Sequence, residues 1–142
     1  MEARPATVDD AAAVAPLLAE LGYPAELEEV RTRLARIVGG AATGVLLAAE
    51  VDGRPAALIG YALIEHLERP QPTCRITALA TAPDQRRRGA AAALLEAVEA
   101  VARETGCERL EVTTRPHRDD ALAFYLDAGF EERPRRLVRS VA

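Results

Sequence analysis

The sequence contains no lysine, and all 18 of its basic residues are arginine. Together with the alanine-rich predicted helices, this composition indicates a GC-rich bacterial genome. A phosphate-binding loop of the Gly-x-x-x-x-Gly-Lys type is absent, because that motif requires a lysine. The net charge of −4 argues against a general nucleic-acid binder, since neutralising many phosphates requires a basic surface.

Cysteine is also scarce, with only Cys74 and Cys107 present. Neither their number nor their spacing fits a zinc site or a disulfide framework, so we expect two buried, reduced thiols and no metal. No apolar run approaches the ~18–20 residues that span a bilayer. Residues 1–5 lack the apolar core of a signal peptide, and we therefore expect a cytoplasmic protein that binds no membrane.

The length and composition suit one folded domain. The chain has 142 residues, of which 49% are hydrophobic and 28% charged. A domain of this size buries roughly 68–70% of its unfolded surface without the help of metals or disulfides. No internal repeat or low-complexity linker divides the sequence. We predict a single domain over residues 1–142.

The apolar periodicity and the glycine and proline positions predict the order of the elements. We expect a strand at 2–7, helices at 8–21 and about 24–38, a hairpin of strands 45–51 and 56–67, a strand at 73–81, a helix at 89–105, a strand at 110–114, a helix at 119–128 and short extended pieces at 130–132 and 136–139. This order predicts an α/β (α+β) fold. Its mixed, mostly antiparallel sheet has about six to seven strands and four helices on both faces.

The most informative segment runs from Leu79 to Ala91. An apolar strand passes through three consecutive arginines and Gly89 into an alanine-rich helix. This arrangement places unpaired backbone N–H groups and the positive end of the helix dipole at one spot. Three cations there oppose the dipole, which favours a bound anion such as a phosphate. A solvated cluster at the start of a helix is the alternative.

Two motifs in this chain resemble the signatures of one enzyme family. The spacing Arg-x-x-Gly-x-Ala over residues 86–91 resembles the acyl-CoA pyrophosphate loop of the GCN5-related N-acetyltransferases (GNAT family). Further along, Ala-x-x-Phe-Tyr-x-x-x-Gly-Phe over residues 121–130 resembles the second signature of that family. The order of the predicted elements is similar to the family fold, so the resemblance extends over the whole chain.

The resemblance implies an activity and a cofactor. It implies transfer of an acetyl group from acetyl-CoA to a primary amine of a small molecule or peptide, by direct attack in a ternary complex. A homodimer is compatible with it. Two alternatives stay open, namely transfer of a longer acyl group and a non-catalytic acyl-CoA sensor or interaction module.

The resemblance also implies where the cofactor binds. In this family the pantetheine arm lies beside the end of a central strand, as an added strand would. The pyrophosphate lies on the backbone amides that open the next helix. The positions that match are Leu79, Ala80, Thr81, Arg86, Arg87, Arg88, Gly89, Ala90 and Ala91, with Arg118 as a further contact.

Acyl transfer to an amine needs a neutral amine and a proton for the departing thiolate. Tyr125 matches the family tyrosine that commonly donates to the sulfur as general acid, although a core aromatic is its alternative. The base is harder to identify, because the predicted strand at 73–81 contains no carboxylate. Glu65 or His66 is the candidate on the preceding strand, and His117 is a further one near the second motif.

The second predicted helix carries an acidic run, Glu26, Glu28 and Glu29. Relatives in the family often line the acceptor site with this helix, so a cationic acceptor would suit it. A solvated helix face is the alternative interpretation.

Overall fold

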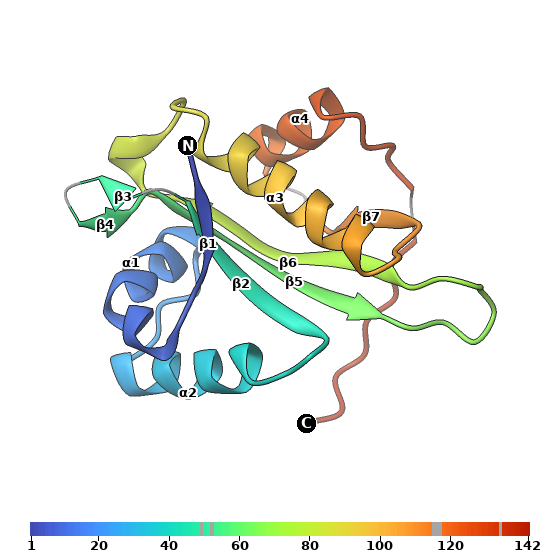
Figure 1. The fold of residues 1–142 in the computed structure, drawn as a ribbon, viewed down its shortest axis with the longest axis horizontal. Helices are drawn as coiled ribbons and strands as arrows, with labels where there is room; N and C mark the ends of the chain where they lie inside the picture. The colour runs from blue at the N-terminus through green and yellow to red at the C-terminus, as the bar shows by residue number, and fades with distance from the viewer. Residues whose placement is uncertain (49, 52, 115–117, 134) are drawn as a thin grey trace. The chain divides into compact units, whose positions relative to one another are not determined.

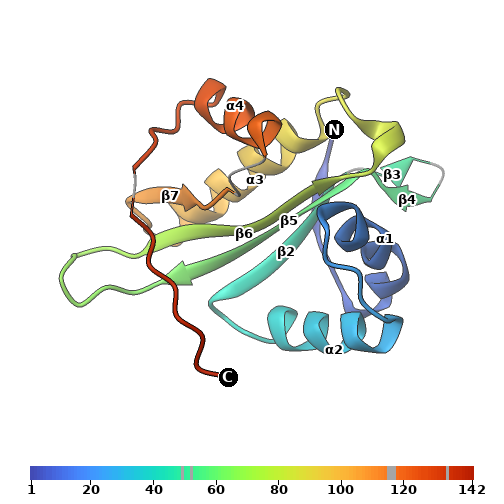
Figure 2. The same ribbon diagram turned by 180° about the vertical axis from the view of Figure 1, so that it is seen from behind.

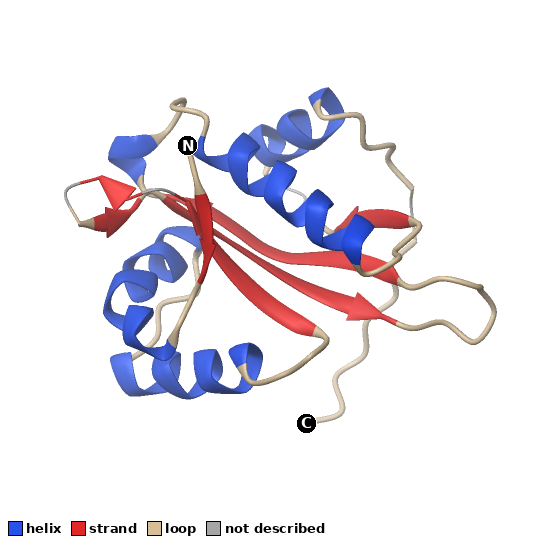
Figure 3. Cartoon of the chain, viewed as in Figure 1, coloured by secondary structure: helices blue, strands red, loops and turns tan. Residues whose placement is uncertain are grey.

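The computed structural model describes the chain except for residues 49, 52, 115–117 and 134. The chain divides into two compact units, Met1–Val112 and Thr113–Ala142. The first unit contains the sheet and three α-helices, and the second contains α4 (Asp119–Asp127) and the C-terminal segment (Figure 3). Within the described residues, no helix is both long and apolar enough to cross a membrane.

The sheet of the first unit has five strands in the order β1–β2–β5–β6–β7 (Figure 1). They are β1 (Ala3–Pro5), β2 (Thr43–Ala48), β5 (Ala57–Ile64), β6 (Thr73–Thr81) and β7 (Arg109–Val112). Neighbouring strands are antiparallel except β6 and β7, which run parallel. Between β2 and β5, the short strands β3 (Glu50–Val51) and β4 (Arg54–Pro55) form a separate hairpin.

Helices cover both faces of this sheet (Figures 1 and 2). On one face lie α1 (Ala11–Leu21), which follows the short 3-10 helix η1 (Val8–Asp10), and α2 (Leu27–Val38). On the other face lies α3 (Ala90–Glu104).

The two faces bury different side chains of the same strands. Leu47 and Leu58 belong to the core cluster that contains Val14 of α1 and Leu34 of α2. Because side chains alternate along a strand, Ile59 points the other way, toward the side that α3 covers with Leu94 and Val98. These three side chains are fully buried. The alternation of side chains along these strands therefore separates two apolar layers.

The predicted order of elements is confirmed from β1 to α4, but the end of the chain differs. Residues 130–133 and 135–142 contain no helix or strand, so the two predicted C-terminal strands are wrong for these residues. The sheet consequently has five strands instead of six or seven. Leu137 and Val141 are 95% and 100% exposed, and without burial no gain offsets the entropy cost of ordering a strand.

Asp10 fixes the start of the first helical segment. Its carboxylate accepts hydrogen bonds from the backbone N–H of Thr7 at 2.7 Å and from both terminal nitrogens of Arg4 at 2.8 and 2.9 Å. The hydrogen bonds from Arg4 are the main cause that lowers the pKa of Asp10 to about 2. The ionised carboxylate therefore stabilises the folded state.

We expect Asp10→Asn to lower the free energy of unfolding at neutral pH by about 2 kcal/mol. The folded pKa lies below the unfolded value of 3.8, so this contribution is present above pH 4 and is lost as the pH falls from 3.8 to about 2. Urea unfolding of both proteins at pH 7 and at pH 2.5 measures it. An equal difference at the two pH values would contradict the assignment.

Candidate active site

The two edges of β6 differ. On one edge β6 pairs with β5 from Thr73 to Thr81, with only Thr77 left out of the register. On the other edge the parallel strand β7 pairs only with residues 73–76 (Figure 2). In the described part of the chain, residues 77–81 therefore have no strand partner on this second edge. Their backbone N–H and C=O groups can pair with an extended ligand.

The free edge of β6 begins at a β-bulge. Gly60 of β5 pairs with Ala78, whereas Tyr61 pairs with Ile76, so Thr77 is an extra residue in β6. A Cβ at Gly60 would lie only 2.8 Å from Thr77 Oγ1, so the missing side chain makes room for the bulge. A bulge increases the local twist and redirects the groups around it, and bulges are frequent next to active sites.

Three residues predicted to contact the cofactor arm, Leu79, Ala80 and Thr81, lie on this free edge. Ala80 is buried in the core cluster beneath α1 and α2. Leu79 and Thr81 are half-buried and alternate to the opposite face of the sheet. An arm that paired with this edge would therefore contact backbone on a segment anchored in the core.

A strained loop connects β6 to α3. After the short 3-10 helix η2 (Pro83–Gln85), Arg87 has a φ of +63° and Gly89 a φ of +85°. Such left-handed positions direct neighbouring backbone N–H groups into anion-binding concavities. A non-glycine residue in this conformation costs about 1–2 kcal/mol, and such strain is concentrated at functional sites.

The loop ends at the uncapped N-terminus of α3. Gly89 is the N-cap residue, and no described side chain caps the helix or places a carboxylate in its first turn. The N–H of Ala93 donates to the Gly89 carbonyl at 3.0 Å, so the amides of residues 90–92 precede the first intrahelical acceptor. A Cβ at Gly89 would meet no atom within 4 Å. The helix end is thus accessible to an anion.

The three arginines of the loop are exposed, and only one of them is paired within the described residues. Arg86 donates from Nη2 to Glu20 Oε1 at 2.5 Å, across the space between the loop and α1. Neither Arg87 nor Arg88 forms an ion pair with a described carboxylate. Among the described residues, Arg87, Arg88 and the positive helix end therefore have no carboxylate as a counter-charge.

In the second unit, Tyr125 lies in α4 and is 5% exposed. The rings of Phe124 and Phe130 contact it edge-on, with centroids 5.3 and 5.2 Å away. Burial raises the pKa of Tyr125 to about 12, although the charge of Arg118 acts in the opposite direction. The phenol is therefore protonated throughout the neutral pH range, as a hydrogen-bond donor must be. Arg118 precedes α4 and lies 3.4 Å from Asp120.

The two base candidates that the sequence places on the strand before β6 lie just beyond the end of β5 in the structure. Glu65 is exposed, and the Nε2 of His66 forms a hydrogen bond with Thr73 Oγ1 at 2.8 Å. Because Ile64 pairs with Thr73, both groups lie at the start of β6, and four residues of strand place Thr77 about 13 Å away. The structure does not bring either group to the free edge. His117 lies outside the described residues.

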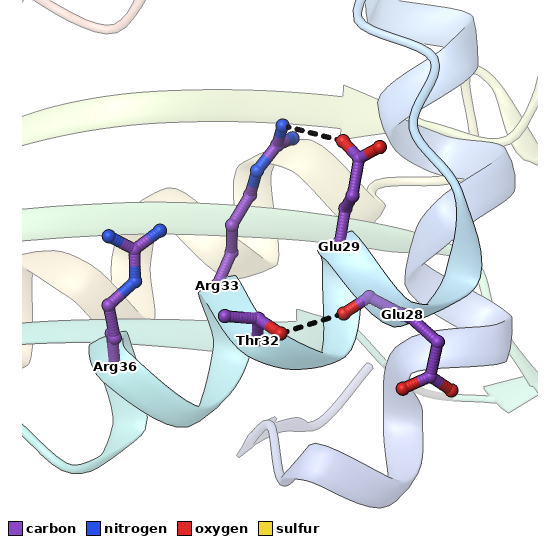
Figure 4. A pocket seen from close by; sticks show the side chains of 5 residues that line it. All are labelled: Glu28, Glu29, Thr32, Arg33 and Arg36. Atoms are coloured by element: carbon purple, nitrogen blue, oxygen red, sulfur yellow. Dashed lines mark hydrogen bonds and ion pairs between the residues drawn. The ribbon is translucent and has the colours of Figure 1, made fainter.

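The acidic run falls on the outer face of α2, next to a shallow depression (Figure 4). The side chains that line it are Glu28, Glu29, Thr32, Arg33 and Arg36. All five come from one helix. Glu29 pairs with Arg33 at 3.3 Å and Glu28 with Arg31 at 2.5 Å, so both carboxylates already have a cation. These contacts favour the solvated helix face over an acceptor pocket.

Two features of this region could not be predicted from the sequence. The bulge at Thr77 follows from strand register, for which β6 itself carries no local signal. The contact of Glu20 with Arg86 joins residues 66 positions apart. In the described residues, no group of three or more His, Cys, Asp or Glu side chains could hold a metal ion.

A partly unpaired central strand that leads into a basic helix N-terminus is a geometry suited to a phosphate-bearing cofactor with an extended arm. The chain belongs to the acetyltransferase (GNAT) family, whose profile matches residues 12–130. It is an acyltransferase that uses acetyl-CoA, as predicted from its two motifs. No curated protein matches the chain significantly.

Solved structures share the fold over almost the whole chain. An aminoglycoside 6′-N-acetyltransferase of Acinetobacter haemolyticus has a TM-score of 0.81 and 17% identity, covering 100% of this chain and 99% of its own. A second aminoglycoside N-acetyltransferase, solved with CoA, has a TM-score of 0.82 and 17% identity, with 99% of both chains covered. A transcriptional regulator of Bacillus halodurans reaches 0.86 and 20% identity, with 98% of both covered. At such identities the likeness shows the fold alone.

Proposed function

We propose that this protein transfers the acetyl group of acetyl-CoA to a primary amine of a small molecule or peptide, by direct attack in a ternary complex. The observation that carries the proposal is the free edge of residues 77–81, which leads within a few residues into the uncapped start of α3. The edge offers hydrogen bonds to the two amides of pantetheine. The helix start offers amides and positive charge to the diphosphate.

The cofactor contacts follow from this placement. Leu79, Ala80 and Thr81 pair through their backbone with the arm. The diphosphate binds the amides of residues 87–91, with the guanidinium groups of residues 86–88 as counter-charges. Arg118, in the second unit, is a further proposed contact that rests on the family resemblance alone.

The chemistry requires groups that act on the carbonyl and on the sulfur. Backbone N–H groups freed near the bulge at Thr77 are suited to polarise the thioester carbonyl. Tyr125 donates a hydrogen bond to the sulfur as negative charge develops. A phenol with a pKa of about 12 is a weaker acid than a thiol with a pKa near ~8.5, so it stabilises the thiolate mainly without giving up its proton.

The acceptor amine must lose a proton before attack. An alkyl amine with a pKa near ~10.4 is neutral in only about one molecule in a few thousand at pH 7. Glu65 or His66 could receive this proton only through intervening water, because both lie at the far end of the β5–β6 pair. We propose that water and desolvation of the bound amine supply the deprotonation.

An amine is the acceptor class that we favour. Two proteins with this fold are aminoglycoside N-acetyltransferases. Polyamines, amino acids, aminoglycosides and peptide termini all present amines of the required chemistry. Transfer of a longer acyl group would change only the volume required beside the thioester.

Calorimetric titration with acetyl-CoA tests the cofactor, with ATP and 3′-dephospho-CoA as controls. We expect micromolar binding of acetyl-CoA and clear discrimination against ATP. Release of CoA in the presence of a mixed amine panel, followed from pH 6 to 9, then tests the acceptor. Absence of acetyl-CoA binding would overturn the proposal, and CoA release that no amine accelerates would overturn the amine acceptor.

A further inference from the structure

The contact between Glu20 and Arg86 ties the cofactor loop to α1. Glu20 lies in the last turn of α1 and accepts a hydrogen bond from Arg86 Nη2 at 2.5 Å. Glu20 is 34% exposed and Arg86 is 57% exposed, so solvent and ions can reach the pair. Within the described residues, no other carboxylate forms an ion pair with the arginines of the loop.

The charges around Arg86 explain why a carboxylate pairs with it. Three consecutive arginines immediately precede the N-cap residue of α3, so their charges repel one another and are repelled by the positive end of the helix dipole. Arg87 between them is held in a left-handed conformation. An anion at this point relieves the repulsion. The Glu20 carboxylate supplies one such negative charge from a different element of the fold.

We propose that Glu20 is an internal counter-ion that competes with the diphosphate of acetyl-CoA for Arg86 and thereby sets the affinity of the loop. The inference rests on the proposed function, in which this loop holds the diphosphate. Glu20 neutralises part of the charge that attracts the cofactor, and its carboxylate repels the incoming phosphates. Glu20 is thus a residue that tunes cofactor affinity without taking part in acetyl transfer.

The size of the effect follows from the exposure of the pair. Exposed ion pairs contribute only modestly, because solvent and salt screen them. We therefore expect Glu20→Gln to bind acetyl-CoA about 3- to 10-fold more tightly than the wild type at low salt. This gain in affinity should shrink at high salt. Salt screens both the repulsion between Glu20 and the phosphates and the attraction of the phosphates to Arg86.

The variant should fold normally. The end of α1 is closed by backbone hydrogen bonds from Gly22 to Ala19 at 3.0 Å and from Tyr23 to Leu18 at 2.9 Å. Gly22 has the positive φ of +99° that such a helix end requires. None of these contacts uses the Glu20 side chain. A thermal melt equal to that of the wild type is expected.

The experiment is a double-mutant cycle measured by calorimetry with acetyl-CoA. It compares the wild type, Glu20→Gln, Arg86→Gln and the double variant. The gain from Glu20→Gln should disappear in the Arg86→Gln background. Inorganic pyrophosphate, used as a competitor of acetyl-CoA, should also gain affinity in Glu20→Gln. The matched control is Glu99→Gln, which removes the same charge from a pair with Arg103 at 2.9 Å on α3 and should leave the affinity unchanged.

Two results would overturn the inference while leaving the proposed function standing. One is an affinity of Glu20→Gln equal to or weaker than that of a wild type that binds acetyl-CoA. The other is an equal gain with and without Arg86, which would reduce the effect to net charge. If the wild type bound neither acetyl-CoA nor pyrophosphate, the proposed function would fail first and the inference with it.

Discussion

Tyr125→Phe should lower kcat by ~10²-fold or more and leave the affinity for acetyl-CoA nearly unchanged. The substitution removes one hydroxyl and keeps the ring, so the edge-on contacts with Phe124 and Phe130 persist. The lost hydrogen bond matters most when charge develops on the sulfur, which places the effect in the transition state. Steady-state kinetics of CoA release, together with calorimetry of acetyl-CoA binding, separates the two quantities.

The pH dependence gives this prediction a second test. Burial raises the pKa of Tyr125 to about 12, so the donor is protonated across pH 6 to 9 and should add no ionisation there. Wild type and variant should therefore show parallel pH profiles, separated by a constant factor. Tyr61→Phe is the matched control, because that ring packs against Gly44 of β2, on the side of β5 away from β6. An unchanged kcat in Tyr125→Phe would remove Tyr125 from the mechanism.

Local patterns in the sequence were sufficient for most of the first unit. The apolar positions of α2 and α3 follow the helical period, and Gly22 ends α1 with a positive φ as its position in the sequence suggests. The loop at 86–89 also had a local signal, because arginines, a glycine and a helix start are consecutive in the chain. The role of this loop in cofactor binding stays a prediction.

Features that depend on register or on distant partners could not be predicted in this way. The bulge at Thr77 results from how β5 and β6 align, and the partner of Arg86 comes from α1. In the C-terminal segment a local pattern predicts a strand that does not form. The apolar residues Leu137 and Val138 favour a strand, but such residues form one only where a sheet edge and a core receive them.

The bases predicted from the sequence show why residue type alone is insufficient. Histidine and glutamate are the predicted bases because both side chains can accept a proton near neutral pH. In the structure Glu65 is exposed, and the side chain of His66 forms a hydrogen bond with Thr73. Neither residue lies along the free edge of β6. A catalytic base must lie within hydrogen-bond reach of the proton it takes, directly or through one water. That condition is geometric and depends on the antiparallel pairing of β5 with β6.

Gly89→Val should weaken acetyl-CoA binding by ~10²-fold, the largest effect on affinity that we expect. Gly89 has a φ of +85°, which a β-branched residue adopts only with strain, and it occupies the N-cap position of the helix whose amides would face the diphosphate. A shift of this backbone would cost at least two charge-assisted hydrogen bonds, each worth about 1.5–3 kcal/mol. Calorimetry measures the loss directly.

A general loss of stability caused by backbone strain must be distinguished from loss of the diphosphate site, and Gly106 offers the matched control. Gly106 follows the other end of α3, has a φ of +77°, and like Gly89 has no atom within 4 Å of an added Cβ. Gly106→Val should therefore lower the melting temperature by a similar amount and bind acetyl-CoA normally. Equal loss of affinity in both variants would indicate a global effect. Normal affinity in Gly89→Val would show that the loop does not hold the diphosphate. Valine is strained at the φ of Gly89, so the backbone that would bind the diphosphate should shift in this variant.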